Sequence, residues 1–128
     1  MYTTTPTAYG IAVTVEGRPT PEELKVVNAA LMDAARTKPG FSLLIDLSKA
    51  QVASDADSQA MISERYGKLF GAGMHRLAIV VSSATVGIQV KRLIAQAVGD
   101  KVISERVRMI DPTTPNWRAD AEQWLLLR

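Results

Sequence analysis

Few side chains in this 128-residue chain are of the types that carry out catalysis. The single histidine, His75, lies in a glycine-rich turn ahead of an apolar run. A Ser-His-Asp triad would have to recruit Ser82 or Ser83 and Asp46. The Gly-x-Ser-x-Gly motif that exposes a nucleophilic serine does not occur in the sequence. We therefore interpret His75 as a surface turn residue and expect neither catalytic residues nor enzyme activity.

Motifs for metals and cofactors are equally sparse. The chain has no cysteine, so it lacks the thiolate ligands that zinc prefers. Asp55 and Asp57 have no third oxygen ligand at a fixed spacing, and acids in the first turn of a helix complement its dipole. Gly71 and Gly73 resemble the start of a dinucleotide-binding motif, but Arg76 occupies the position of the third glycine. The sequence predicts no metal site and no cofactor.

The elements that position these side chains follow from the hydrophobic pattern. Apolar runs predict strands, and apolar residues spaced three and four apart predict amphipathic helices between them. In chain order we expect strand 9–17, helix 20–38, strand 41–47, helix 54–70, strand 76–82, helix 83–98, strand 106–110 and helix 117–125. Residues 1–8 form either a short edge strand or a flexible tail. This alternation is typical of a single α/β domain with a largely parallel sheet.

The pattern within the strands predicts their places in the sheet. Strands 41–47 and 76–82 are apolar on both faces, which is typical of adjacent, parallel strands in the middle of a covered sheet. Strand 106–110 alternates arginine with apolar residues, so we expect it to lie outside them. At the start of the first strand, alternation places Tyr9 on the same face as Ile11.

Two helices have more specific signals. Thr20 and Glu23 have the spacing of a capping box at the start of the first helix. Trp117 and Trp124 are seven residues apart and therefore share a face of the last helix. We expect both tryptophans to be mostly buried in the core; a partly exposed contact surface or a lid over an apolar cavity is the alternative.

The carboxyl ends of the two central strands lead into helix starts, and this edge carries our candidate binding residues. In open α/β sheets, ligands bind outside the carboxyl ends of the parallel strands. The first of these helices begins with its own acids. The second begins with hydroxyls and no carboxylate, so it is the better anion site, with helix capping as the alternative role. The candidate partner- or ligand-binding residues are Ser48, Ser54, Asp55, Ser58, Ser82, Ser83 and Thr85.

Composition and charge exclude several classes of function. The chain is 47% hydrophobic and 22% charged, and its 15 basic and 13 acidic residues leave a net charge of +2. That surplus is too small for a nucleic-acid-binding surface. The longest apolar runs are far shorter than the roughly 20 residues of a membrane span. We expect no membrane span, no signal peptide and, because cysteine is absent, a cytoplasmic location.

Four strings in the chain, in this order and spacing, resemble those of a known family. They are VEGRPTPEEL, FSLLIDLSKAQV, RLAIVVS and AEQWLL, within residues 9–126. The chain resembles the SpoIIAA-like proteins, small stand-alone relatives of the STAS domain of anti-sigma-factor antagonists. The resemblance implies a mixed, mainly parallel sheet of four to five strands, with helices largely on one side. It also implies regulation through contact with a protein partner.

In STAS proteins, a serine at the start of the helix after a DLS strand is phosphorylated by a partner kinase. Asp46, Leu47 and Ser48 match the DLS part of the pattern. Without gaps, the phosphoacceptor position falls on Asp55 instead of serine; Ser54 and Ser58 are the nearest hydroxyls. We therefore expect no phosphorylation at this helix and a fixed negative charge where the relatives carry a switchable one.

The sequence thus predicts a non-enzymatic STAS-type module that binds a protein partner, a second copy of the chain being one candidate. The alternative is a carrier or sensor of a small apolar or lipid-like ligand, because the SpoIIAA-like proteins also look similar to the CRAL-TRIO lipid carriers. A carrier needs an apolar cavity. A partner-binding module needs an exposed surface around residues 48–57 and 82–85.

Overall fold

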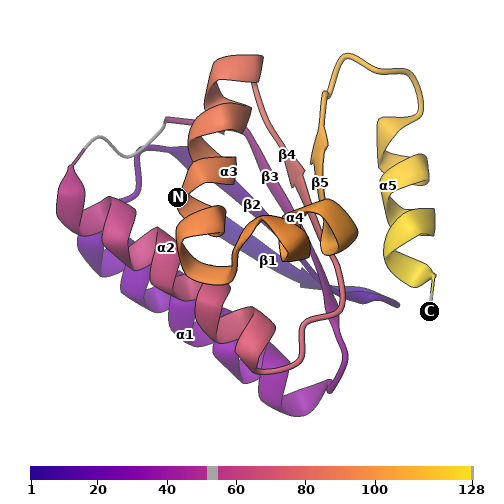
Figure 1. Ribbon diagram of the computed structural model, residues 1–128, viewed down its shortest axis with the longest axis horizontal. Helices are drawn as coiled ribbons and strands as arrows, with labels where there is room; N and C mark the ends of the chain where they lie inside the picture. The colour runs from indigo at the N-terminus through magenta and orange to yellow at the C-terminus, as the bar shows by residue number, and fades with distance from the viewer. Residues whose placement is uncertain (52–54, 128) are drawn as a thin grey trace.

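The computed structural model describes residues 1–51 and 55–127 (Figure 1). In these ranges the chain forms five strands and five helices. They are β1 (Tyr2–Pro6), β2 (Gly10–Gly17), α1 (Pro21–Thr37), β3 (Ser42–Ala50), α2 (Ala56–Gly71), β4 (Leu77–Val80), α3 (Ala84–Val98), α4 (Asp100–Arg106), β5 (Val107–Ile110) and α5 (Trp117–Leu126). The predicted α/β class is confirmed.

The strands form one sheet in the order β1-β2-β3-β4-β5. β1 pairs antiparallel with β2, and the remaining neighbours pair in parallel, with Leu43 of β3 opposite Leu77 of β4. The two apolar strands are therefore adjacent, parallel and inside the sheet, and β5 lies at its edge, as predicted. At the other edge, the N-terminal residues form the strand β1.

The start of α1 shows how local sequence positions one end of the sheet. The Thr20 hydroxyl accepts a hydrogen bond from the backbone N–H of Glu23 at 3.2 Å, and the Glu23 carboxylate accepts one from the backbone N–H of Thr20 at 3.3 Å. This is the predicted capping box, with Pro21 in the first turn. It places Leu24 and Val27, which are buried, beside the ends of β2 and β3.

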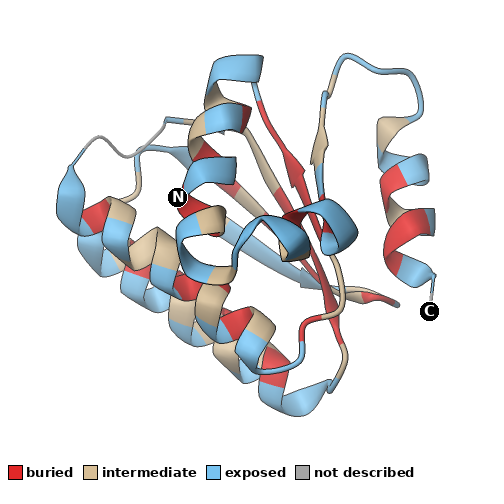
Figure 2. Cartoon of the chain, viewed as in Figure 1, coloured by how far each residue is buried: buried red, intermediate tan, exposed pale blue. Residues whose placement is uncertain are grey.

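The sheet separates two hydrophobic cores. The main core lies between the sheet and helices α1 to α4, and it receives Leu43 and Ile45 from β3. The second core lies on the opposite face under α5, and it receives Leu44 from the same strand. Figure 1 shows α5 apart from the other helices, and Figure 2 shows burial concentrated on the central strands and the inward helix faces. The predicted placement of helices largely on one side is confirmed.

The structure corrects the expected position of Tyr9. Ile11 packs in the main core, whereas Tyr9 packs in the second core on the other face of the sheet. The cause is Gly10 between them, whose φ of 151° interrupts the alternation of a regular strand. A Cβ atom on Gly10 would overlap the carbonyl oxygen of Ser42 on β3, so the absence of a side chain allows this close approach.

Two further expectations are wrong in part. The residues between helix 83–98 and strand 106–110, for which the sequence predicted no element, form the short helix α4, which runs directly into β5. Its apolar residues are too few to produce a helical period that can be recognised in the sequence. Trp124 is buried as expected, but Trp117, in the first turn of α5, is only partly buried.

Candidate functional site

Ser48 lies near the end of β3 and bonds within its own strand. Its hydroxyl donates to Oδ1 of Asp46 at 2.6 Å, and its backbone N–H donates to the same oxygen at 2.9 Å. Both side chains are half-buried. This local contact occupies one oxygen of Asp46 where the pairing of β2 with β3 shifts register.

Asp55 is the N-cap of α2 and is exposed. Its side chain accepts a hydrogen bond from the backbone N–H of Ser58 at 2.9 Å. That bond, with a smaller contribution from the Ser58 hydroxyl, lowers the pKa of the Asp55 carboxyl. Ser58 itself is 3% exposed. Its hydroxyl is therefore a poor target for a kinase, and Ser54 lies outside the described residues.

The second predicted helix start is also exposed. Ser83 is the N-cap of α3, and its hydroxyl accepts a hydrogen bond from the backbone N–H of Val86 at 3.2 Å. Ser82, Ser83 and Thr85 are all exposed. One turn further along α3, Ile88 is 70% exposed. The surface at this helix start therefore combines hydroxyls with an apolar side chain.

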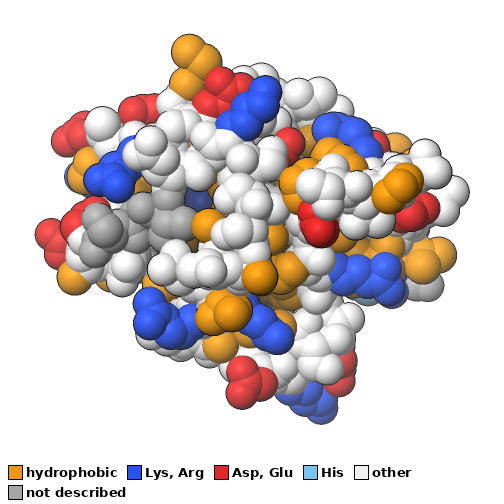
Figure 3. Space-filling model, turned by 90° about the horizontal axis from the view of Figure 1, so that it is seen from above, with side chains coloured by type: hydrophobic (Ala, Val, Ile, Leu, Met, Phe, Trp, Pro, Cys, Tyr) orange, Lys and Arg blue, Asp and Glu red, His pale blue; other side chains and the backbone are white. Residues whose placement is uncertain are grey.

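Both candidate segments flank a pocket at the carboxyl edge of the sheet, which we call the edge pocket. It has a cavity volume of about 70 Å³. Its lining residues are Met1, Tyr2, Val15, Pro19, Glu23, Leu24, Val27, Leu47, Ala50, Gln51, Ile62, Arg65, Tyr66, Val86, Val90 and Leu93. Figure 3 looks down on this edge of the molecule and shows hydrophobic side chains exposed among charged ones.

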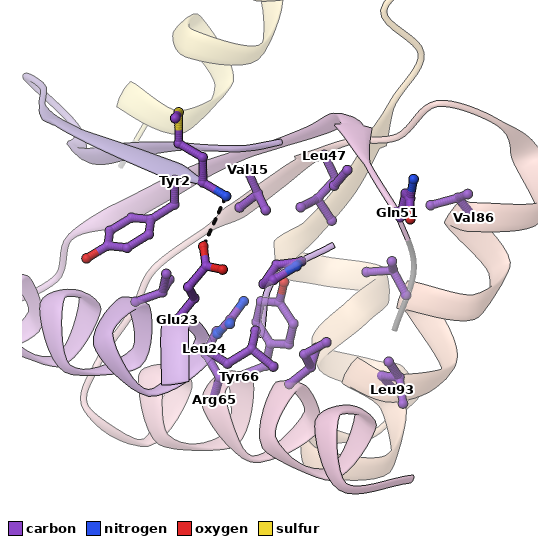
Figure 4. A pocket seen from close by; sticks show the side chains of 16 residues that line it. Tyr2, Val15, Glu23, Leu24, Leu47, Gln51, Arg65, Tyr66, Val86 and Leu93 are labelled. Carbon is purple, nitrogen blue, oxygen red and sulfur yellow. Dashed lines mark ion pairs between the residues drawn. The ribbon is translucent and has the colours of Figure 1, made fainter. Parts of the chain in front are cut away.

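The lining of the edge pocket comes from both layers of the main core. Val15 and Leu47 point from the sheet toward Leu24 and Tyr66 on the helices, and Gln51 and Val86 lie at one end (Figure 4). Most of the lining side chains are aliphatic. A mostly apolar lining with a few polar groups is a composition that small-molecule sites share.

The polar groups of the edge pocket are concentrated on its helical wall. Arg65 on α2 is 7% exposed, and its Nε donates to Oδ1 of Asn28 on α1 at 2.5 Å. Its guanidinium carbon lies 5.9 Å from the centre of the Tyr66 ring. Burial raises the pKa of the Tyr66 phenol, and the guanidinium of Arg65 opposes that shift. The phenol is therefore neutral at neutral pH and able to donate a hydrogen bond.

The sequence placed Arg65 and Tyr66 only within the periodic pattern of a helix and did not identify them as candidate binding residues. A signal was present, since Arg65 falls within the inward stripe of α2, between Ile62 and Leu69. Arginine is seldom buried without a partner, so its place in such a stripe indicates a polar site.

Other groups offer little further chemistry. Within residues 1–51 and 55–127, no group of three or more His, Asp or Glu side chains is placed to hold a metal ion. None of the helices that the structure describes is long and apolar enough to cross a membrane.

His75 lies next to the start of β4, and its backbone N–H donates to the carbonyl of Phe41 at 2.8 Å.

Comparison with known proteins identifies the fold. No family model matches the sequence, and no curated protein matches it. Among solved structures, an uncharacterised protein of the DUF3478 family from Shewanella loihica, described as having a SpoIIAA-like fold, is similar with a TM-score of 0.63. The match covers 98% of this chain and 92% of that chain at 16% identity. The topology is therefore SpoIIAA-like, as the sequence resemblance implied.

Proposed function

We propose that this chain, with its SpoIIAA-like fold, is a non-enzymatic binding module that holds a small apolar ligand in the edge pocket. The observation that carries the proposal is the aliphatic lining at the carboxyl ends of β2 and β3. Ligands of open α/β sheets bind at that end of the strands. A cytoplasmic location belongs to the same proposal and is supported by the absence of cysteine.

The size of the edge pocket limits the ligand. Its volume of about 70 Å³ is about half that of the roughly 150 Å³ apolar cavity that binds benzene in another protein. The pocket can therefore enclose only part of a short aliphatic chain, and it is too small for a whole lipid. Native mass spectrometry of freshly purified protein would show whether a ligand of this size accompanies the chain.

The variant Ala50→Leu tests the pocket directly. Ala50 lines it from the end of β3 and is half-buried, so a larger aliphatic side chain there fills space that a ligand would use. We expect wild-type protein to bind 1-hexanol saturably in NMR titrations and Ala50→Leu to lose that binding while keeping its fold. Ala60→Leu, at an exposed position on α2, makes the same change away from the pocket and should bind normally. Unaltered binding by Ala50→Leu would place the ligand elsewhere.

A regulatory protein partner is the second candidate function, and a specific surface favours it. Exposed Ser82, Ser83 and Thr85 adjoin exposed Ile88, and Asp55 presents its charge at the start of the neighbouring helix α2. An isolated exposed isoleucine beside such polar groups suits a transient protein contact. The fixed charge of Asp55 would hold this surface in one binding state.

The variant Asp55→Ser separates the charge of Asp55 from its capping role. Serine caps helices about as well as aspartate, so α2 should remain intact. We expect intact-mass spectra to show no phosphate on wild-type protein after incubation with STAS-type kinases and one phosphate on the variant, which peptide mapping should locate at residue 55. Asp57→Ser, in the first turn of the same helix, removes an equal charge and is the control. Modification of wild-type protein at Ser54 or Ser58 would contradict a constitutive role for Asp55.

A further inference from the structure

We propose that the ligand of the edge pocket is a short-chain aliphatic carboxylate, with the carboxylate bound by Arg65 and the chain packed against the aliphatic lining. This inference rests on the proposed function, because it names the chemical class of ligand for the same pocket. It starts from a charge on the pocket wall that the described part of the chain does not neutralise.

Arg65 is a buried cation without an acidic partner. It is 7% exposed, and among the described residues no carboxylate lies within ion-pair distance of its guanidinium. The amide of Asn28 accepts from Nε but carries no charge. Burying a charge is unfavourable unless an opposite charge and hydrogen bonds compensate it. A bound carboxylate would supply both, because its two oxygens can accept parallel N–H bonds from one guanidinium.

The other charged groups that line the edge pocket do not neutralise Arg65. Glu23 lines the pocket, but its Oε2 lies 3.0 Å from the amino group of Met1, an ion pair marked in Figure 4, and its Oε1 accepts from Thr20. The negative charge of Glu23 is therefore matched at the mouth of the pocket. The positive charge of Arg65 remains, so the charge of the wall favours an anionic ligand over a neutral or cationic one.

Arg65 also lines a second hollow on the outer side of α1 and α2. That hollow has a volume of about 420 Å³ and includes Lys25, Glu64 and Lys68. Lys68 and Glu64 pair with each other at 2.9 Å. The outer hollow has several charged side chains, whereas the edge pocket is mainly aliphatic. An amphipathic anion therefore places its chain in the edge pocket and its carboxylate at Arg65.

The test compares three ligands with the same chain and different head groups: hexanoate, 1-hexanol and hexylamine. We expect wild-type protein to bind hexanoate more tightly than 1-hexanol, and hexylamine least, in calorimetric or NMR titrations. Arg65→Met should weaken hexanoate binding by about tenfold to a hundredfold, the range of a charged hydrogen bond, and change 1-hexanol binding little. Lys68 lies on the same helix and lines only the outer hollow. The Lys68→Met protein loses the same charge away from the edge pocket and should bind hexanoate normally.

A second measurement does not depend on the folding of the Arg65 variant. The carboxyl carbon of ¹³C-labelled hexanoate, observed while bound to wild-type protein, should titrate at a lower pH than that of free hexanoate, because the guanidinium favours the charged form. Equal binding of hexanoate and 1-hexanol, or loss of hexanoate binding in Lys68→Met, would overturn the inference and leave the apolar pocket intact. Absence of binding by all three ligands would overturn the proposed function itself.

Discussion

Replacing Trp124 with alanine is expected to lower the free energy of unfolding by about 3–5 kcal/mol, as truncation of a large core side chain does. Trp124 is 8% exposed and is the largest buried side chain of the second core. The guanidinium carbons of Arg76 and Arg108 lie over its ring, 5.0 Å and 4.5 Å from the ring centre. The variant loses both the buried apolar surface and these cation–π contacts. Urea unfolding followed by circular dichroism measures the change.

Two variants on the same helix separate this effect from a general weakening of α5. Trp117→Ala removes an equally large side chain that is only partly buried, so we expect a smaller loss, of about 1–2 kcal/mol. Leu126→Ala removes an exposed side chain and should have little effect. A loss below about 1 kcal/mol for Trp124→Ala would show that the second core contributes little to stability.

Gly10→Ala is expected to destabilise the protein by about 3 kcal/mol or more, because it combines two penalties. The φ of 151° at Gly10 is one that residues with a side chain rarely adopt. The added Cβ would also overlap the carbonyl oxygen of Ser42 and lie 2.9 Å from its backbone nitrogen. Neither atom can move away easily, because both belong to the neighbouring strand. Denaturant unfolding at equilibrium tests the prediction.

Two other glycines serve as matched controls. Gly17 has a φ of 71° and open space around its missing Cβ, so Gly17→Ala should show the backbone penalty alone, about 1–2 kcal/mol. Gly71 at the end of α2 has neither positive φ nor close neighbours, so Gly71→Ala should be neutral or slightly stabilising. If Gly10→Ala costs no more than Gly17→Ala, the contact with Ser42 is not the main constraint.

The central strands and the start of α1 were predictable from sequence because each is determined by a short, local pattern of residues. Leu43, Leu44 and Ile45 form an apolar run with no polar face, and such a strand must be covered on both sides. The capping box of Thr20 and Glu23 marks the start of α1 within four consecutive residues. In both cases a short stretch of chain contains the whole signal, and the tertiary structure agrees with it.

The candidate site was predictable only as a region. The edge pocket lies between the segments that were expected to bind, but its lining comes from three strands and three helices. Hydrophobic periodicity indicates which side of an element faces inward; it does not show whether opposing side chains fill the space between them. For the same reason the sequence did not identify Arg65 as a candidate, because it does not show whether an acidic side chain lies near the guanidinium in space.

The division of the molecule by its sheet has a consequence for cooperativity. The edge pocket belongs to the main core, whereas α5 rests on the opposite face and is held through the small second core. Because α5 packs in its own core, separate from that of the other helices, it can detach in a local opening event that leaves the rest of the fold in place. Ligand binding stabilises only the states in which the pocket exists, and an opening of α5 preserves the pocket. We therefore expect amide hydrogen exchange in α5 not to depend on occupancy of the pocket, so that the sheet would separate two units that open independently.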